Sequence, residues 1–138
     1  MKFLIIFLTI YLFSFPSLAK KNEPYYSEKF CVDVFSGTSE DKIREEGKII
    51  ASIDCSTTTK AMEFGWGDSD VFDNIGQSLF YSAKTGKSPT IVLLVKEEMK
   101  ENDIRKSIRK IEDVNKAFGL YIEIILLKIP DGEVLKYK

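Results

Sequence analysis

The sequence has no histidine, only two cysteines and a single tryptophan. Without histidine, a Ser–His–Asp triad and a zinc site built on imidazole are both excluded. An excess of charge of one sign is also missing, because the 138 residues carry 20 basic and 21 acidic side chains. The chain therefore has no polybasic surface, and any nucleic-acid binding must depend on a local group of side chains.

The longest apolar run lies at the amino terminus. Lys2 precedes the mostly apolar residues 3–13, and small side chains follow at Ser17-Leu18-Ala19. This order is typical of a secretory signal peptide over residues 1–19, so we expect an exported protein, periplasmic or secreted, with no stable membrane anchor after cleavage. The alternative is a retained anchor, but the run is shorter than the ~20 residues of a membrane span and Pro16 interrupts its end.

Both cysteines, Cys31 and Cys55, lie in the mature chain. In an oxidising, exported environment an even pair favours a disulfide. Closing a loop of this size would stabilise the fold by roughly 3 kcal/mol. Two buried thiols are the alternative.

Hydrophobic periodicity predicts one α/β domain over residues 27–138, preceded by a flexible leader at residues 20–26. A helix is expected from Ser27 to Phe35, and Glu40 would lie in it or in the loop that follows. Apolar alternation predicts strands at Lys48–Cys55 and Lys60–Trp66.

The second half alternates helices with strands, which favours a mixed sheet with helices packed on it. A helix is expected from about Asp68 to Ala83, a strand buried on both faces at 90–95, a second helix after it, and a last strand at 121–129. The expected core-facing residues of the two helices are Phe72, Ile75, Leu79 and Ala83 on the first and Ile104, Ile108, Ile111 and Phe118 on the second.

Two acids occupy neighbouring predicted strands. Asp54 ends the run IIASID, and Glu63 lies inside AMEFGW. Adjacent strands can bring both carboxylates to one end of a sheet, and paired carboxylates suit Mg²⁺, which can activate water and stabilise the charge of a reacting phosphodiester. Glu40 could add a third ligand. The alternative is an ordinary turn acid at Asp54 and a salt-bridged strand acid at Glu63.

Polar and basic side chains on the two later helices are further candidates. Gln77 and Tyr81 are four residues apart and share a face roughly opposite the apolar stripe, so they could point at a site or form an ordinary polar face. Arg105 and Arg109, with Lys106 and Lys110, could contact phosphates. A solvated helix face is the alternative, which the neighbouring acids Glu112 and Asp113 favour.

Four short motifs occur in one order: Gly37-x-x-Glu40, Ile53-Asp54-Cys55, Ala61-Met62-Glu63-Phe64 and Ile75-Gly-Gln-Ser-Leu-Phe-Tyr81. Together they resemble the PD-(D/E)XK nuclease superfamily, and in particular small bacterial nuclease-like proteins with a VDC…AIE…IGQxLxY pattern. The resemblance covers roughly residues 30–96. It implies a restriction-endonuclease-like α-β-β-β-α-β core with acids that hold magnesium.

Carried over by position, the resemblance assigns a role to each candidate. Glu40 would be the helix acid, Asp54 the principal metal ligand and Glu63 the second ligand. Gln77 would orient a phosphate or water, supported by Tyr81.

The usual lysine of this motif stands two residues after the second acid, where this chain has Gly65. Lys60, three residues before Glu63, is the candidate substitute. With the signal-peptide pattern, the resemblance implies an exported magnesium-dependent nuclease acting on DNA or RNA. The alternative is a nuclease-fold module that has lost activity and serves in binding or structure, which Gly65 favours. Trp66 would belong to the core or offer a surface for base stacking.

Overall fold

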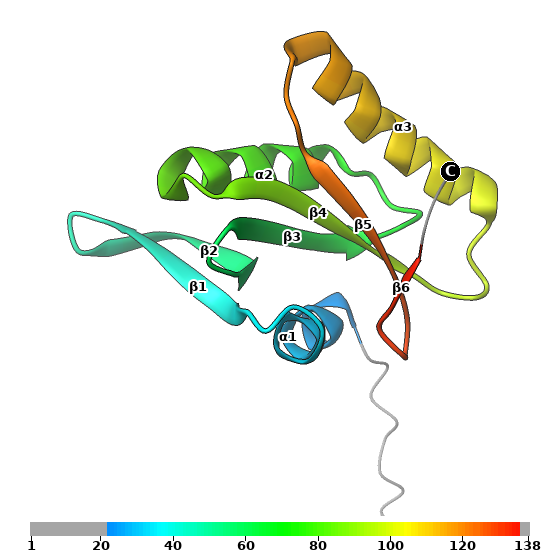
Figure 1. The fold of residues 1–138 in the computed structure, drawn as a ribbon, viewed down its shortest axis with the longest axis horizontal. Helices are drawn as coiled ribbons and strands as arrows, with labels where there is room; N and C mark the ends of the chain where they lie inside the picture. Colours follow the sequence, from blue (N-terminus) through cyan, green and yellow to red (C-terminus); the bar gives the residue numbers. More distant parts are fainter. Residues whose placement is uncertain (1–21, 136–138) are drawn as a thin grey trace, which may run out of the picture.

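The computed structural model describes residues 22–135 and shows a six-stranded mixed sheet with helices on both faces (Figure 1). The elements in chain order are α1 (Glu23–Asp33), β1 (Thr38–Glu45), β2 (Lys48–Ser56), β3 (Lys60–Trp66), α2 (Phe72–Thr85), β4 (Ser88–Val95), α3 (Glu101–Phe118), β5 (Glu123–Lys128) and β6 (Glu133–Leu135). The predicted α/β class with a mixed sheet is confirmed. The predicted signal peptide lies outside the described residues, and within 22–135 no helix has the length and apolar character of a membrane span.

The spatial order of the strands follows the chain from β1 to β6. Strands β1, β2 and β3 form an antiparallel meander, β3, β4 and β5 run parallel, and β6 returns antiparallel to β5. Helix α1 covers one face, where the core cluster includes Phe30, Phe64 and Leu94. Helices α2 and α3 cover the other face, around Leu93 and Ile111. The β1–β2 hairpin projects beyond these layers (Figure 1).

The first helix begins earlier than its sequence pattern predicts. Helix α1 starts at Glu23, because the Asn22 side chain accepts a hydrogen bond from the Tyr25 amide and Pro24 fits the first turn. Residues 23–26 are therefore helical, and that part of the predicted flexible leader is wrong. Ser27 is not the cap but a buried residue in the helix.

The segment after α1 is a strand, so the expectation that Glu40 lies in the helix or its following loop is wrong. Strand β1 has the sequence TSEDKIRE, which lacks apolar alternation because it forms the exposed edge of the sheet. An edge strand needs little apolar surface, and charged side chains there discourage pairing with other chains.

The predicted core faces of both helices are partly wrong. On α2, Phe72 is 56% exposed, and the buried residues are Asn74, Ile75, Ser78 and Tyr81. On α3, Ile108 and Ile111 are buried as predicted, whereas Phe118 is 75% exposed at the helix end. Polar residues replace apolar ones on the buried face of α2 because they find hydrogen-bond partners there, as Asn74 does at the Phe64 carbonyl.

The predicted disulfide is present. Cys31 of α1 and Cys55 of β2 are joined, with 5.3 Å between their Cα atoms, and both residues are fully buried. Gly37 lies against the bridge, since a Cβ there would stand 2.7 Å from the Cys55 sulfur. The bond fixes the helix to the strand that carries Asp54.

Replacing both cysteines by serine should lower the free energy of unfolding by about 3 kcal/mol, because the bridge closes a loop across 24 residues. Urea denaturation of the oxidised protein and the Cys31→Ser/Cys55→Ser variant would measure this difference. Reduced wild-type protein is the control and should unfold near the midpoint of the variant. Equal midpoints for the variant and the oxidised wild type would contradict the assigned role of the bridge.

Candidate functional site

Strands β2 and β3 separate soon after they meet. They pair only at Cys55–Met62 and Ser56–Ala61, although β2 pairs with β1 along most of its length. Continued in the same register, Asp54 would face Glu63 at the first position beyond the last pair. The Phe64 amide on this side of β3 donates to Asp54 Oδ2 at 2.9 Å. The Asp54 carboxylate thus takes the place of a backbone carbonyl of β2 as the acceptor for the Phe64 amide. Asp54 and Glu63, the two predicted acids, therefore lie where β2 and β3 separate.

Glu63 is buried without a full set of hydrogen-bond partners. Its side chain is 6% exposed, and Oε2 has no partner among the described residues. Burial, followed by the charges of Asp54 and Glu23, raises the pKa of Glu63 to about 9, against the opposing effect of a hydrogen bond with the Tyr81 hydroxyl. Glu63 therefore carries a proton at neutral pH.

Glu23 is a further acid of this site that the sequence analysis missed. It lies in the first turn of α1, and partial burial together with the charges of Asp54 and Glu40 raises its pKa to about 7. Burial also raises the pKa of Asp54, while the hydrogen bond from the Phe64 amide lowers it. The sequence signal for it is the helix start Asn22-Glu23-Pro24, which lies within the predicted leader.

Glu40 is directed to a different set of partners. Its Oε2 accepts hydrogen bonds from Lys42 Nζ at 2.9 Å and from Ser52 Oγ at 2.8 Å, which hold its pKa below the ordinary value. Its backbone has a φ of 52°, in the left-handed region that non-glycine residues seldom adopt. Lys42, which the sequence analysis did not select, is thereby attached to the acid cluster formed by Glu23, Glu40, Asp54 and Glu63.

The predicted three-acid metal set of Glu40, Asp54 and Glu63 is not assembled in this structure. Within residues 22–135, no three acidic or cysteine side chains lie close enough together to enclose a metal ion. Magnesium, however, is usually held by only one or two carboxylates, with waters and substrate phosphates completing its shell. Asp54 and Glu63 fit that smaller requirement, because Glu63 Oε2 is a buried oxygen without a partner in the described chain.

Lys60 does not serve as the substitute for the motif lysine. It stands three residues from Glu63 on β3, and residues an odd number apart point to opposite faces of a strand. Its Nζ pairs with Glu123 Oε2 of β5 at 2.6 Å. The structure therefore places Lys60 on the other side of the sheet from Glu63.

The position of the motif lysine is occupied by another side chain. A Cβ on Gly65 would lie 2.9–3.2 Å from the carboxamide atoms of Asn74. Asn74 is buried on α2 and held there by the hydrogen bond from its Nδ2 to the Phe64 carbonyl at 2.9 Å. Any side chain at residue 65 must therefore displace a fixed amide.

Tyr81 belongs to the core, contrary to the prediction that it lies away from it. It packs with Ile53 and Ala61, and its hydroxyl lies 2.9 Å from both the Ser52 carbonyl oxygen and Gln77 Oε1. These contacts fix α2 against β2 beside Glu63. Tyr81 and Gln77 are thus brought to the site region, with Tyr81 as a buried support.

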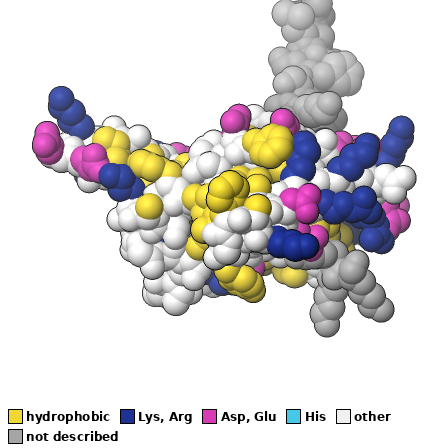
Figure 2. Space-filling model, turned by 90° about the horizontal axis from the view of Figure 1, so that it is seen from above, with side chains coloured by type: hydrophobic (Ala, Val, Ile, Leu, Met, Phe, Trp, Pro, Cys, Tyr) yellow, Lys and Arg dark blue, Asp and Glu magenta, His cyan; other side chains and the backbone are white. Residues whose placement is uncertain are grey.

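The basic residues of α3 are not brought to the acids. Arg105 pairs with Glu101, Lys106 with Asp103 and Lys110 with Asp70, and Arg109 is exposed. Helix α3 lies on the side of the sheet opposite α1 (Figure 1), and basic and acidic side chains are intermixed on the surface around it (Figure 2). The arrangement is that of a solvated helix face.

No family model, curated protein or solved structure matches this chain. The resemblance to PD-(D/E)XK nucleases therefore stays a prediction.

Gly65→Ala should destabilise the protein by about 1–3 kcal/mol, because the new methyl group overlaps the fixed Asn74 amide. Gly76→Ala is the matched control: nothing lies within 4 Å of a Cβ there, and alanine in a helix interior should stabilise by up to ~1 kcal/mol. Denaturant midpoints give both values. If Gly65→Ala is as stable as the wild type, Asn74 moves aside and the space is open to a side chain.

Glu63→Gln should stabilise the protein at neutral and basic pH. The folded-state pKa of about 9 lies above the reference value of 4.5, so the protonated form favours folding and this contribution is lost as pH rises from 4.5 to 9. Glutamine cannot ionise, and the variant should gain roughly 4 kcal/mol at pH 7.5 and almost nothing at pH 4.5.

Denaturation across this pH range would measure the difference between the two proteins. The control is Glu112→Gln, an exposed position on α3, whose effect should be small at every pH. A pH-independent difference for Glu63→Gln would show that the carboxyl is not held in its neutral form.

Proposed function

We propose that the protein is an exported, magnesium-dependent nuclease-like hydrolase that cleaves phosphodiester bonds in nucleic acid. The observation that carries this proposal is the buried, unpartnered Oε2 of Glu63, set beside Asp54 where β2 and β3 separate. A buried carboxyl oxygen without a partner costs stability, and such costs concentrate at functional sites.

The order of elements supports the same function. The run α1-β1-β2-β3-α2-β4 follows the α-β-β-β-α-β order that the motif resemblance implies, and the two motif acids stand on β2 and β3. The amino-terminal leader pattern and the Cys31–Cys55 disulfide support export.

Asp54 and Glu63 would hold the metal, which when bound would supply charge stabilisation and a more acidic water. Glu63 must lose its proton for this role. The helix acid that the resemblance requires is then Glu23, which lies in α1, whereas Glu40 lies in β1. With a pKa of about 7, Glu23 can accept a proton from water at neutral pH and later release it. Lys42, bonded to Glu40, would contact a phosphate oxygen.

A nuclease-fold module without activity is the second candidate. The observation that favours it is Asn74, which fills the space that the motif lysine would need. Such a module would keep the fold, and its function would be binding or structural.

The test is cleavage of plasmid, single-stranded DNA and RNA by the oxidised mature protein during titration with Mg²⁺ or Mn²⁺. Asp54→Asn keeps an oxygen that can accept from the Phe64 amide but removes the charge. It should lower the rate at least about 100-fold, since changes even to residues behind a metal ligand cost about 10–100-fold. The matched control is Glu123→Gln, an acid of the same sheet paired with Lys60, which should retain activity.

The outcomes separate the two candidates. Metal-dependent cutting that is lost in Asp54→Asn supports the hydrolase. Metal binding by calorimetry without cutting supports the inactive module. If the protein neither binds the metal nor cuts nucleic acid, the nuclease proposal is rejected.

A further inference from the structure

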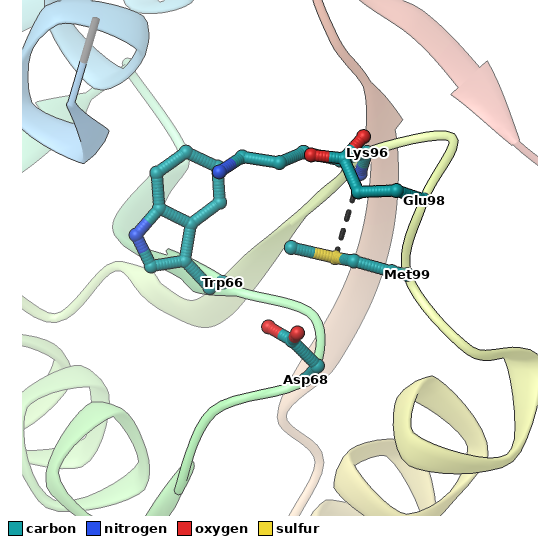
Figure 3. Close-up of a pocket in the computed structure, with 5 residues that line it drawn as sticks. All are labelled: Trp66, Asp68, Lys96, Glu98 and Met99. Carbon is teal, nitrogen blue, oxygen red and sulfur yellow. Dashed lines mark hydrogen bonds between the residues drawn. The ribbon is translucent and has the colours of Figure 1, made fainter. Parts of the chain in front are cut away.

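An open hollow of about 230 Å³ lies where strands β3 and β4 end (Figure 3). Trp66 is the last residue of β3 and Lys96 follows the last residue of β4, and Asp68, Glu98 and Met99 complete the lining. Ligands of sheets with parallel strands commonly bind beyond the carboxyl ends of those strands. The volume is below the ~300–1,000 Å³ of sites that enclose a drug-sized molecule, so it suits a single ring system.

The ring of Trp66 is a fixed surface in this hollow. Tyr26 of α1 makes a T-shaped contact with it, with 6.2 Å between ring centroids, and the next residue is held to β4 by the hydrogen bond from the Gly67 amide to the Leu94 carbonyl. Trp66 remains partly exposed. It therefore presents an aromatic face that does not need to reorganise when a ligand binds.

The charged amino group of Lys96 lies over this ring. Lys96 Nζ lies 4.1 Å from the Trp66 ring centroid, and no ion pair to it occurs among residues 22–135. Figure 3 shows the Lys96 side chain extending to the Trp66 ring. A cation–π contact at an exposed site is weaker than the stacking of a nucleobase on an aromatic ring. A base can therefore displace the lysine, and the released ammonium stays close enough to pair with a phosphate.

The other lining groups select the part of a nucleic acid that enters. The carboxylates of Asp68 and Glu98 repel phosphate but accept hydrogen bonds from exocyclic amino groups, which adenine, cytosine and guanine carry and thymine lacks. The base is then inside the hollow and the backbone outside, beside Lys96. Only an unpaired base can enter, because stacking in a duplex covers its faces.

The hollow is connected to the acid cluster through α1. Glu23 and Tyr26 are three residues apart and so lie on the same side of the helix. Glu23 interacts with Asp54, and Tyr26 contacts Trp66. A single strand seated on Trp66 would therefore pass along α1 toward the split between β2 and β3.

We propose that the Trp66–Lys96 hollow binds one unpaired nucleobase of single-stranded nucleic acid, with Lys96 on the adjacent phosphate; this inference rests on the proposed function and names its substrate as single-stranded. Because Trp66 is the single tryptophan of the sequence, its fluorescence reports directly on the hollow.

The experiment titrates oxidised wild-type protein in EDTA, so that binding is separated from cutting, with oligo(dA), oligo(dC), oligo(dT) and a DNA duplex. We expect saturable quenching of Trp66, strongest with oligo(dA) and oligo(dC), weaker with oligo(dT) and weakest with the duplex. By anisotropy of a labelled strand, Trp66→Leu should bind roughly 5- to 150-fold more weakly, the loss of one stacked base. Trp66→Phe, which retains a ring and the packing against Tyr26, should recover most of the affinity.

Phe72 is the matched control, because it is an exposed aromatic residue with a lysine, Lys110, 4.9 Å from its ring centroid. Phe72→Leu should bind as the wild type does. Lys96→Gln should weaken binding and reduce its salt dependence.

Binding and cutting together distinguish this inference from the proposed function. Quenching without metal-dependent cutting supports the hollow and rejects the hydrolase. Cutting by a protein whose affinity is unchanged in Trp66→Leu and Trp66→Phe overturns the hollow and leaves the hydrolase standing. Equal affinity for duplex and single strands would also overturn it.

Discussion

The hydrogen bond from the Phe64 amide to the Asp54 carboxylate joins β2 to β3 at the point where their backbone pairing ends. Beyond this point β2 continues with β1 as a projecting hairpin (Figure 1). The next residue of β2, Cys55, is bonded to α1, so two consecutive residues fix a helix and a neighbouring strand to β2. Carboxyl groups from four elements interact electrostatically around this point: Glu23 of α1, Glu40 of β1, Asp54 of β2 and Glu63 of β3.

The mutual repulsion of these four acids opposes folding. Asp54, Glu23 and Glu40 each raise the pKa of Glu63, and burial raises it further. Only Glu40 has a cation, Lys42, bonded to it within the described cluster. Polar groups buried without partners are among the more destabilising features of a fold. If this site had been selected only for stability, one substitution at Glu63 would have removed that destabilisation.

Prediction from the sequence was right for strands that bury apolar side chains in a regular pattern. Strand β3 and the aliphatic strand β4 were found at nearly their observed bounds, and cysteine parity gave the disulfide. Prediction from the sequence was wrong for α2, which buries polar side chains, and for β1, an exposed strand of charged residues. The pattern of α2 pointed to Phe72, but the helix buries Asn74 and Tyr81 instead, because contacts to Phe64 and Ser52 on other strands satisfy their polar atoms. Such partners are distant in sequence, and no periodicity encodes them.

The chain has Gly65 where the nuclease motif that it resembles has a lysine. Asn74 fills the space beside Gly65, and Lys60 lies on the other face of the sheet, so neither position can supply an ammonium next to Glu63. In the proposed hydrolase, proton transfer would therefore involve a carboxyl group. The pKa of Glu23 is raised to about 7 because burial and the charges of Asp54 and Glu40 disfavour its ionised form. A bound cation would lower that pKa and make Glu23 a weaker base, while it stabilised the ionised form of Glu63. In the proposed hydrolase, metal binding would therefore be linked to proton release from Glu63, and the balance between Glu23 and Glu63 would decide whether the cluster hydrolyses a bound strand or only holds it.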